Sequence, residues 1–438
     1  MADHAFQPET LAIHAGQIPD RETGARALPI YQTTSFVFDS ADHAASLFNL
    51  QTFGNVYTRL SNPTVAALEE RVAALEGGRA AIACASGMAA ESMALLTILQ
   101  QGDHIVAAGA LYGGSVTMLA VNLKRFGIET TFVDVTKPEA FAAATKPETR
   151  AVYVESLGNP SMIVPDIAAI AEVAHAHGVP LVVDNTVPSP FLCQPLKHGA
   201  DIVVHSATKY LAGHGTTLGG VIVESGKPQG KFAWDNGKFP GMVEPSPGYH
   251  GVKFYETFGD FGYTMRARME QLRVFGAALA PMSAWQILQG VETLPLRMER
   301  HCRNALAVAQ YLRDDPRVAW VNYPGLPEHP QHALVQRQMR AFGEVPGASG
   351  LLAFGLKGGM AAGVKFIESV QFLSHLVNIG DTRTLVSHPS STTHRQLDEA
   401  QQRAAGVTPD MVRISVGLEH IDDILWDIDQ ALSKAAST

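Results

Sequence analysis

Short apolar runs alternate with amphipathic stretches after residue 60, and this alternation restricts the possible folds more than any other feature. The runs are rich in β-branched residues, and most of the intervening stretches repeat their apolar positions at helical spacing, as in 166–177 before Gly178. Strands that alternate with helices form βαβ units and a largely parallel sheet. The sequence therefore predicts an α/β fold with a mostly parallel seven-stranded sheet and helices on both faces. The predicted strands are 80–83, 104–107, 130–133, 151–154, 180–183, 201–204 and 220–223.

Lys209 and Asp184 both follow the carboxyl ends of predicted strands. Ligands of open α/β sheets bind at this edge. A lysine there can form a Schiff base with an aldehyde, and an aspartate can pair with a protonated pyridine nitrogen. Enzymes that use pyridoxal 5′-phosphate need both groups. The pair therefore predicts a pyridoxal phosphate site, although either residue alone is more often an ordinary surface or strand-end residue.

The phosphate of such a cofactor needs backbone donors and hydroxyl groups. Ser86, Gly87 and Met88 follow the first predicted strand and open a helix, whose free N–H groups and positive dipole end attract an anion. Gly87 permits close approach of the backbone. Ser206 and Thr208 flank the lysine and add hydroxyl groups. Ser-Gly is also common at ordinary turns, so the prediction depends on combining the two segments.

Other strand ends carry further candidates. Tyr112 follows the second strand and can stack on one face of a pyridine ring, although a simple loop tyrosine is an equally good interpretation on this evidence. Asn159 follows the fourth strand and can hydrogen-bond the cofactor's phenolic oxygen. Arg413 lies within an apolar C-terminal segment, where a charge is costly unless it is paired. Its partner is either a substrate carboxylate, which arginine binds in bidentate fashion, or a structural acidic residue.

Two rival sites fit the sequence poorly. Gly213, Gly215 and Gly219 have one residue too many for a dinucleotide fingerprint, and a strand rather than a helix follows them. His375, His388 and His394 match no spacing of metal ligands, so we expect no metal.

The pattern divides the chain of 438 residues into three parts. In residues 1–60 the apolar residues have no regular spacing, which predicts an irregular arm that lies across another surface. Residues 61–265 form the predicted cofactor domain, with an aromatic-rich insert at 225–265 that we expect to be ordered. Residues 266–438 predict a smaller α+β domain. It is helical to about 314 with breaks near Pro281 and Pro295, and it continues with strands at 318–321, 351–354 and 412–416 and a helix at 421–435.

Composition limits the class of partner and the location. A formal net charge of −9 argues against nucleic acid or an acidic membrane as the main partner. The chain has no apolar stretch long enough for a membrane span, and its first ten residues lack the apolar core of a signal peptide. Its cysteines, Cys84, Cys193 and Cys302, have neither metal spacing nor an even number. We therefore expect a cytoplasmic protein that acts on small molecules.

These residues, in this order, resemble the Cys/Met-metabolism family of pyridoxal phosphate enzymes, with the type I aminotransferase fold. The resemblance covers nearly the whole chain and is most specific at 201–220. It implies that Lys209 binds the cofactor covalently, that Asp184 pairs with the pyridine nitrogen and that Tyr112 stacks on the ring. It also implies that Tyr57 and Arg59 reach the neighbouring subunit's phosphate, in a homotetramer built as a dimer of dimers.

Within the family, 234–264 and 384–394 resemble the O-acetylhomoserine sulfhydrylase branch. The methionine γ-lyase branch usually has cysteine where this chain has Gly114, and serine where it has Asn378. Asn378 is therefore a candidate second contact to the substrate carboxylate.

The resemblance implies γ-replacement, in which O-acetylhomoserine and sulfide, or a related thiol, give homocysteine and acetate in methionine biosynthesis. Lys209 is the expected base, and Tyr112 and Tyr57 are expected to help with proton transfer in roles that the sequence does not divide. The alternatives are an O-succinylhomoserine sulfhydrylase or cystathionine γ-synthase, then a methionine γ-lyase. A non-catalytic scaffold with the same fold is disfavoured because it would not need Lys209.

Overall fold

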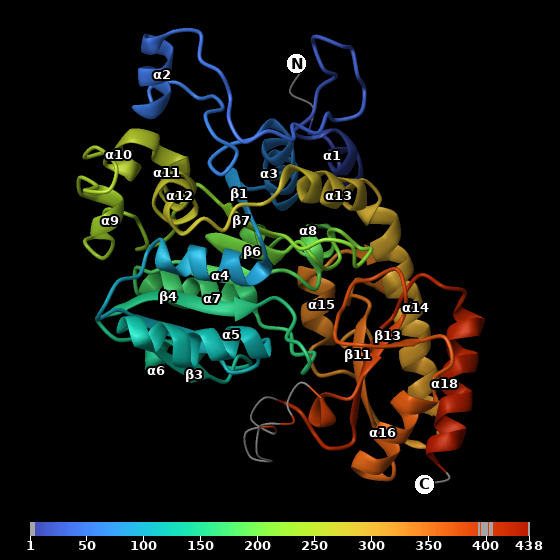
Figure 1. Cartoon of the computed structure of the whole chain (residues 1–438). Helices are drawn as coiled ribbons and strands as arrows, with labels where there is room; N and C mark the ends of the chain where they lie inside the picture. Colours follow the sequence, from blue (N-terminus) through green and yellow to red (C-terminus); the bar gives the residue numbers. More distant parts are fainter. Residues whose placement is uncertain (1–4, 393–394, 396–401, 403–405, 437–438) are drawn as a thin grey trace.

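The computed structural model describes residues 5–392, 395, 402 and 406–436. The larger of its sheets has seven strands in the order β1-β7-β6-β5-β4-β2-β3 (Figure 1). All neighbouring pairs from β6 to β3 are parallel, and β7 is antiparallel to both β6 and β1. The predicted mostly parallel sheet is therefore confirmed, with β7 as the one reversed strand. The strands are β1 Ala80–Cys84, β2 His104–Ala108, β3 Glu129–Val133, β4 Thr149–Glu155, β5 Leu181–Asp184, β6 Ile202–Ser206 and β7 Gly220–Glu224.

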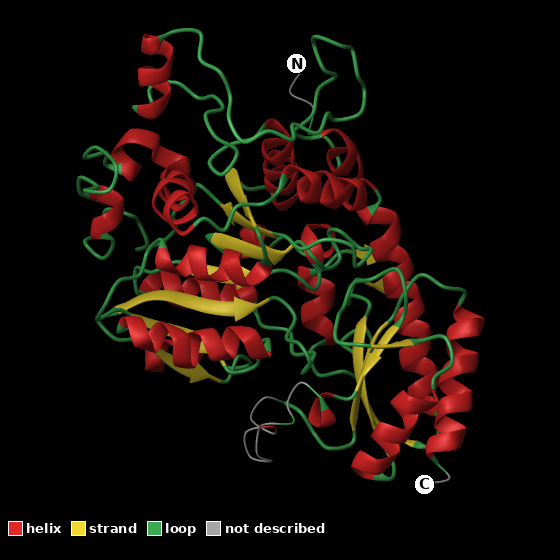
Figure 2. Cartoon of the chain, in the orientation of Figure 1, coloured by secondary structure: helices red, strands yellow, loops and turns green. Residues whose placement is uncertain are grey.

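Helices cover both faces of this sheet (Figure 2). α3 (Pro63–Glu76) packs against β1 and β7, and α4 (Gly87–Leu96) packs against β6 and β7. The two helices lie on opposite faces, because the adjacent residues His205 and Ser206 of β6 meet α3 and α4 respectively. Local sequence determines the helix ends. The Asn62 side chain caps the start of α3, and Gly77 ends that helix at a φ of 72°.

The other helices of this part have the following bounds: α5 Gly113–Thr117, α6 Pro138–Ala144, α7 Ile167–Ala176 and α8 Ser189–Leu192. The insert 225–265 is ordered, as expected, and contains α9 (Pro240–Val243), α10 (Phe254–Phe258) and the start of α11 (Gly262–Arg266). It supplies a small apolar core of its own with the residues that follow it: Tyr249, Phe254, Phe258, Met265 and Met269.

The C-terminal part contains a five-stranded sheet in the order β12-β13-β14-β11-β8, backed by long helices. Its predicted strands and final helix are confirmed, whereas the short strands β12 and β13 and the hairpin of β9 and β10 were not predicted. The strands are β8 Val318–Asn322, β9 Ala341–Phe342, β10 Val345–Pro346, β11 Leu351–Leu356, β12 Ser374–His375, β13 Leu385–Ser387 and β14 Met411–Ser415. The helices from residue 273 are α12 Arg273–Phe275, α13 Pro281–Glu292, α14 Leu294–Asp314, α15 His332–Gln338, α16 Gly359–Ser369 and α18 Ile421–Ala435.

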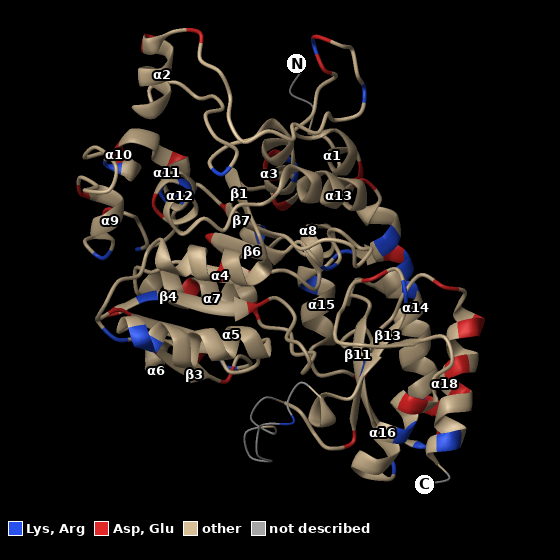
Figure 3. Cartoon of the chain, in the orientation of Figure 1, with Lys and Arg blue, Asp and Glu red and all other residues tan. Residues whose placement is uncertain are grey.

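The final helix α18 is amphipathic, and Figure 3 shows charged residues of both signs along its outer side. Its apolar residues, including Ile424, Ile428 and Leu432, are fully buried against α14 and α16. Within the described residues, no helix combines the length and apolar character needed to cross a bilayer.

The prediction of an irregular arm at 1–60 was partly wrong. The arm contains α1 (Pro8–His14) and α2 (Ala41–Phe48). α1 packs on α3, and the buried Arg71 of α3 donates to the Ala15 carbonyl oxygen at 2.8 Å. Local periodicity missed α1 because the helix is short and its partner lies far along the chain. Beyond α1 the arm exposes apolar side chains such as Val37 and Phe53.

Candidate active site

A cavity of about 200 Å³ lies at the carboxyl ends of β4, β5 and β6. It brings together eleven residues that the sequence nominated: Ser86, Gly87, Met88, Tyr112, Asn159, Asp184, Ser206, Thr208, Lys209, Asn378 and Arg413. Tyr57 and Arg59 line a separate surface hollow beside 278–281 instead. The clustering follows from parallel strands, because their carboxyl ends meet at one edge of the sheet.

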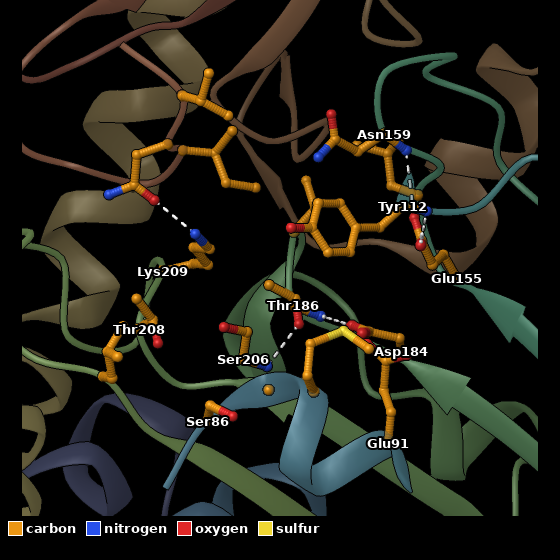
Figure 4. A pocket seen from close by; sticks show the side chains of 18 of the residues that line it. Ser86, Glu91, Tyr112, Glu155, Asn159, Asp184, Thr186, Ser206, Thr208 and Lys209 are labelled. Carbon is orange, nitrogen blue, oxygen red and sulfur yellow. Dashed lines mark hydrogen bonds between the residues drawn. The ribbon is translucent and has the colours of Figure 1, made fainter. Parts of the chain in front are cut away.

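Lys209 lies in the turn after β6 and projects into this cavity (Figure 4). Its Nζ donates to the Asn378 Oδ1 at 2.6 Å. Burial, reinforced by the nearby positive charge of Arg413, lowers the pKa of Lys209 to about 8. A substantial fraction of the amine is therefore neutral near physiological pH, and a neutral amine can act as a nucleophile or a base.

Asp184 ends β5, and its Oδ1 accepts a hydrogen bond from the Thr186 N–H at 2.8 Å. Burial raises the pKa of this carboxyl, and the bonds from Thr186 oppose the rise. Among the described residues, no lysine, arginine or histidine forms an ion pair with it. A partly buried carboxylate without a cation suits a ligand that brings a protonated nitrogen.

The phosphate candidates lie where α4 begins against the end of β6. The Ser86 hydroxyl accepts from the Ala89 N–H at 3.2 Å and so caps α4. Gly87 is required here, because a Cβ at this position would lie 2.5 Å from the Cβ of Ser206. The Thr208 hydroxyl exchanges hydrogen bonds with the backbone of Gly219. The start of α4 and the Ser206 side chain therefore lie close together and line the same cavity, so both can donate to one anion.

Arg413 lies on β14 and is 8 % exposed. Its guanidinium donates to the Asn159 Oδ1 at 2.9 Å and to the Asn378 carbonyl oxygen at 3.2 Å, and its Nε has no partner among the described residues. Burial lowers its pKa to about 10. A structural acidic partner, the alternative left open by the sequence, is not present among the described residues. A buried guanidinium with neutral partners and a free donor is suited to binding a carboxylate.

Several cavity residues were not predicted. Glu155, Thr186 and Glu91 are polar, and Leu157, Val187, Leu218, Val377 and Ile379 are apolar. Glu155 could have been found, because it follows the run 151–154 as Asp184 follows 180–183. Glu91 could also have been found, because it lies one helical turn after Gly87.

The three cysteines and two histidines of the rejected metal hypothesis, His375 and His388, do not line this cavity. Cys84, Cys193 and Cys302 are buried and unpaired, and burial raises the pKa of each thiol. The two ring nitrogens of His388 contact the Ser391 hydroxyl and the Pro409 carbonyl oxygen. His394, like Thr393 in the segment 384–394 used for the branch assignment, lies outside the described residues.

Comparison with known proteins agrees with this geometry. Residues 9–433 match the model of the Cys/Met metabolism PLP-dependent enzyme family. An O-acetyl-L-homoserine sulfhydrylase of Leptospira meyeri is 53 % identical over 98 % of this chain and 97 % of its own. A homocysteine synthase of Schizosaccharomyces pombe is 50 % identical over 98 % of both chains.

A solved structure from Campylobacter jejuni resembles the chain closely. It superposes with a TM-score of 0.93 at 39 % identity, covering 98 % of this chain and all of the other. It is described as an O-acetylhomoserine (thiol)-lyase and contains a lysine joined to the pyridoxyl phosphate group.

Proposed function

The chain belongs to the Cys/Met-metabolism family of pyridoxal-phosphate-dependent enzymes, and from this premise we propose that it converts O-acetylhomoserine and sulfide to homocysteine and acetate. Its relatives named O-acetylhomoserine sulfhydrylase or homocysteine synthase, at about half identity over nearly the full length, support this γ-replacement. The reaction belongs to methionine biosynthesis.

The number of basic residues in the cavity favours an acetyl ester over a succinyl ester as the substrate. Among its described lining residues, only Lys209 and Arg413 are basic. The proposed roles use both, Lys209 at the substrate amine and Arg413 at the α-carboxylate. An O-succinyl ester brings a second carboxylate that would need another cation, because a buried unpaired charge is costly. The neutral acetyl group needs none, and apolar lining residues such as Val187 and Val377 suit its methyl group.

We propose the following residues for the cofactor. Ser86, Gly87, Met88, Ser206 and Thr208 hold the phosphate, with the start of α4 supplying N–H donors. The remaining contacts are Asp184 at the ring nitrogen, Tyr112 on the ring face, Asn159 at the phenolic oxygen and Lys209 at the aldehyde. When bound, pyridoxal phosphate supplies an aldehyde that captures amines and a protonated ring that withdraws electrons.

The chain's own groups then orient the substrate and move protons. Arg413 binds the α-carboxylate, with Asn378 beside it, and this contact directs the α-carbon toward Lys209. With its lowered pKa, Lys209 takes the α-proton and later a β-proton. The carboxylate of Asp184 stabilises positive charge at the ring nitrogen, and that charge in turn favours the ionised carboxylate. Tyr112 and the partner's Tyr57 assist proton transfer near the leaving acetate.

Gly114 favours replacement over the γ-lyase alternative. A Cβ at this position would lie 2.6 Å from Cε1 of the Tyr112 ring and 3.2 Å from the Met88 sulfur. The cysteine that γ-lyases usually carry here would therefore displace Tyr112 from its observed position.

We further propose that the protein is a homotetramer built as a dimer of dimers, in which Tyr57 and Arg59 complete the neighbour's phosphate site. Tyr57 is 41 % exposed and lies outside its own chain's cavity, and the arm exposes Val37 and Phe53. Exposed apolar groups of this kind favour a subunit contact. In this proposal 1–60 is the intersubunit arm, 61–265 the cofactor domain and 266–438 the C-terminal domain. Unpaired cysteines are consistent with a cytoplasmic location.

One incubation tests the reaction. The purified protein is supplied with cofactor, sulfide and either O-acetylhomoserine or O-succinylhomoserine, and homocysteine and 2-oxobutyrate are measured by mass spectrometry. We expect homocysteine mainly from the acetyl ester. A preference for the succinyl ester would move the assignment to an O-succinylhomoserine sulfhydrylase or cystathionine γ-synthase. A majority of 2-oxobutyrate would indicate a γ-lyase.

A further inference from the structure

Glu155 lines the active-site cavity but has no role in the proposed reaction. It ends β4 directly opposite Asp184 of β5 in the parallel register, and it is 7 % exposed. A carboxyl group this buried beside a second carboxyl is unfavourable, and burial, reinforced by the charge of Asp184, raises the pKa of Glu155 well above its usual range. Its presence therefore needs a compensating contact.

The two carboxyl oxygens of Glu155 contact the backbone of two different loops. Oε1 accepts a hydrogen bond from the Tyr112 N–H at 2.5 Å, in the loop between β2 and α5. Oε2 accepts one from the Asn159 N–H at 3.3 Å, in the loop after β4. Both bonds are drawn in Figure 4, where the carboxyl group lies between the two loops. One side chain thus joins loops that approach the cavity from different strands.

Each loop carries a residue of the proposed site. Tyr112 projects its ring toward the centre of the cavity and is 50 % exposed. Neighbouring side chains therefore pack against only part of the ring. Asn159 accepts from the Arg413 guanidinium through its Oδ1. Glu155 therefore contacts the backbone of the residue that carries the ring and of the residue that accepts from Arg413.

We propose that Glu155 is a positioning residue that fixes Tyr112 over the cofactor ring and Asn159 beside Arg413. It acts through the two loop amides rather than by touching substrate. The catalytic consequence rests on the proposed function, but the hydrogen bonds themselves can be measured without it.

Glutamine at position 155 tests this role with little change of shape. In either protonation state both carboxyl oxygens of glutamate can accept a hydrogen bond. The carboxamide of glutamine has only one acceptor oxygen, and its NH₂ group would face the N–H of Tyr112 or Asn159 without bonding it. Glu91→Gln is the matched control. Glu91 lines the same cavity and is 3 % exposed, and its Oε2 has no hydrogen-bond partner among the described residues. Glu91→Gln changes a carboxyl near Asp184 while the Tyr112 and Asn159 N–H groups keep their acceptor, Glu155.

The first measurement is amide hydrogen exchange of the cofactor-loaded protein, resolved to Tyr112 and Asn159. In Glu155→Gln we expect at least one of these amides to exchange roughly tenfold faster, as the loss of a hydrogen bond to a charged or acidic group implies. Glu91→Gln is expected to leave both amides protected. Unchanged exchange at both amides in Glu155→Gln, or an equal increase in Glu91→Gln, would overturn the proposal.

Two further readouts link the contacts to the site. Visible circular dichroism of the bound cofactor is expected to weaken in Glu155→Gln, because Tyr112 loses its fixed position. The kcat of γ-replacement is expected to fall roughly 10- to 100-fold, as a small misplacement of catalytic groups implies. If Glu155→Gln does not fold, Glu155→Asp replaces it, since its shorter side chain draws both oxygens away from the amides. Wild-type protection in that variant would contradict the proposal.

These results separate the proposal from the proposed function. Faster amide exchange in a protein whose wild type forms no homocysteine would refute the reaction and leave the role of Glu155 intact. Normal homocysteine formation by the wild type, with unchanged amide exchange in Glu155→Gln, would support the reaction and refute the role of Glu155.

Discussion

Replacing Arg413 with methionine is expected to stabilise the cofactor-free protein while it strongly weakens the reaction. Arg413 is 8 % exposed, and among the described residues its guanidinium has only the neutral acceptors on Asn159 and Asn378. Replacing a buried ion pair by apolar side chains of similar size is often neutral or stabilising by about 1 to 4 kcal/mol, and a buried ion without a counter-ion has less attraction to lose. Asn159 and Asn378 are only partly buried, so water can satisfy their oxygens in the variant.

The loss of activity follows from the same geometry. Removing one partner of a buried, hydrogen-bonded charge pair costs about 2 to 5 kcal/mol. At about 1.4 kcal/mol per factor of ten, kcat/KM for O-acetylhomoserine should fall about 30- to 4000-fold. Stability and activity are therefore expected to change in opposite directions.

Arg297→Met provides the matched control. Arg297 is equally buried at 5 %, but its guanidinium donates to the carbonyl oxygens of Tyr210, Leu211 and Gly290. The Gly290 oxygen keeps its bonds from Thr293, but the substitution leaves the buried carbonyl oxygens of Tyr210 and Leu211 unpaired and should destabilise the protein by about 2 kcal/mol or more. The assay compares thermal unfolding midpoints of the cofactor-free proteins and steady-state kinetics of the loaded ones. A lower midpoint for Arg413→Met, or a kcat/KM near wild type, would refute the reasoning.

Other expected outcomes concern the cofactor and the subunit contact. Lys209→Ala should lower kcat by about 10,000-fold or more and still bind pyridoxal phosphate without a covalent link, as dialysis and absorbance can check; substantial turnover would contradict its role. Asp184→Asn should lower kcat by about 100-fold or more, and near-normal turnover would exclude the pairing with the ring nitrogen. In the cofactor-free protein, acylation of Lys209, mapped by mass spectrometry, should be half-maximal near pH 8 and should decrease at lower pH, where the amine is protonated. Arg413→Met should move this midpoint to higher pH, because it removes a positive charge that lowers the pKa of Lys209. Arg59→Ala should weaken cofactor binding in the purified oligomer by about tenfold, and unchanged affinity would argue against a site shared between subunits.

The sequence alone predicted most of the large sheet and the residues at its edge. Each strand of that sheet is a short apolar run, and such a run is visible without knowing its neighbours. The predicted strand at 201–204, for example, corresponds to β6 at Ile202–Ser206. Asp184 and Lys209 could be placed together because parallel strands bring their carboxyl ends to one edge. Arg413 was recognisable because a charge inside an apolar strand requires a partner.

The tertiary structure decided the features that depend on residues far apart in the sequence. The reversed direction of β7, the short strands β12 and β13, and the docking of α1 on α3 all depend on a partner segment that local periodicity does not encode. Glu155 shows the same limit within the site. Its position at a strand end is visible in the sequence, but its bond to Tyr112, 43 residues away, exists only because the sheet places β2 beside β4. Local sequence specified the elements and the chemistry at their ends, and long-range strand pairing determined which of these groups touch.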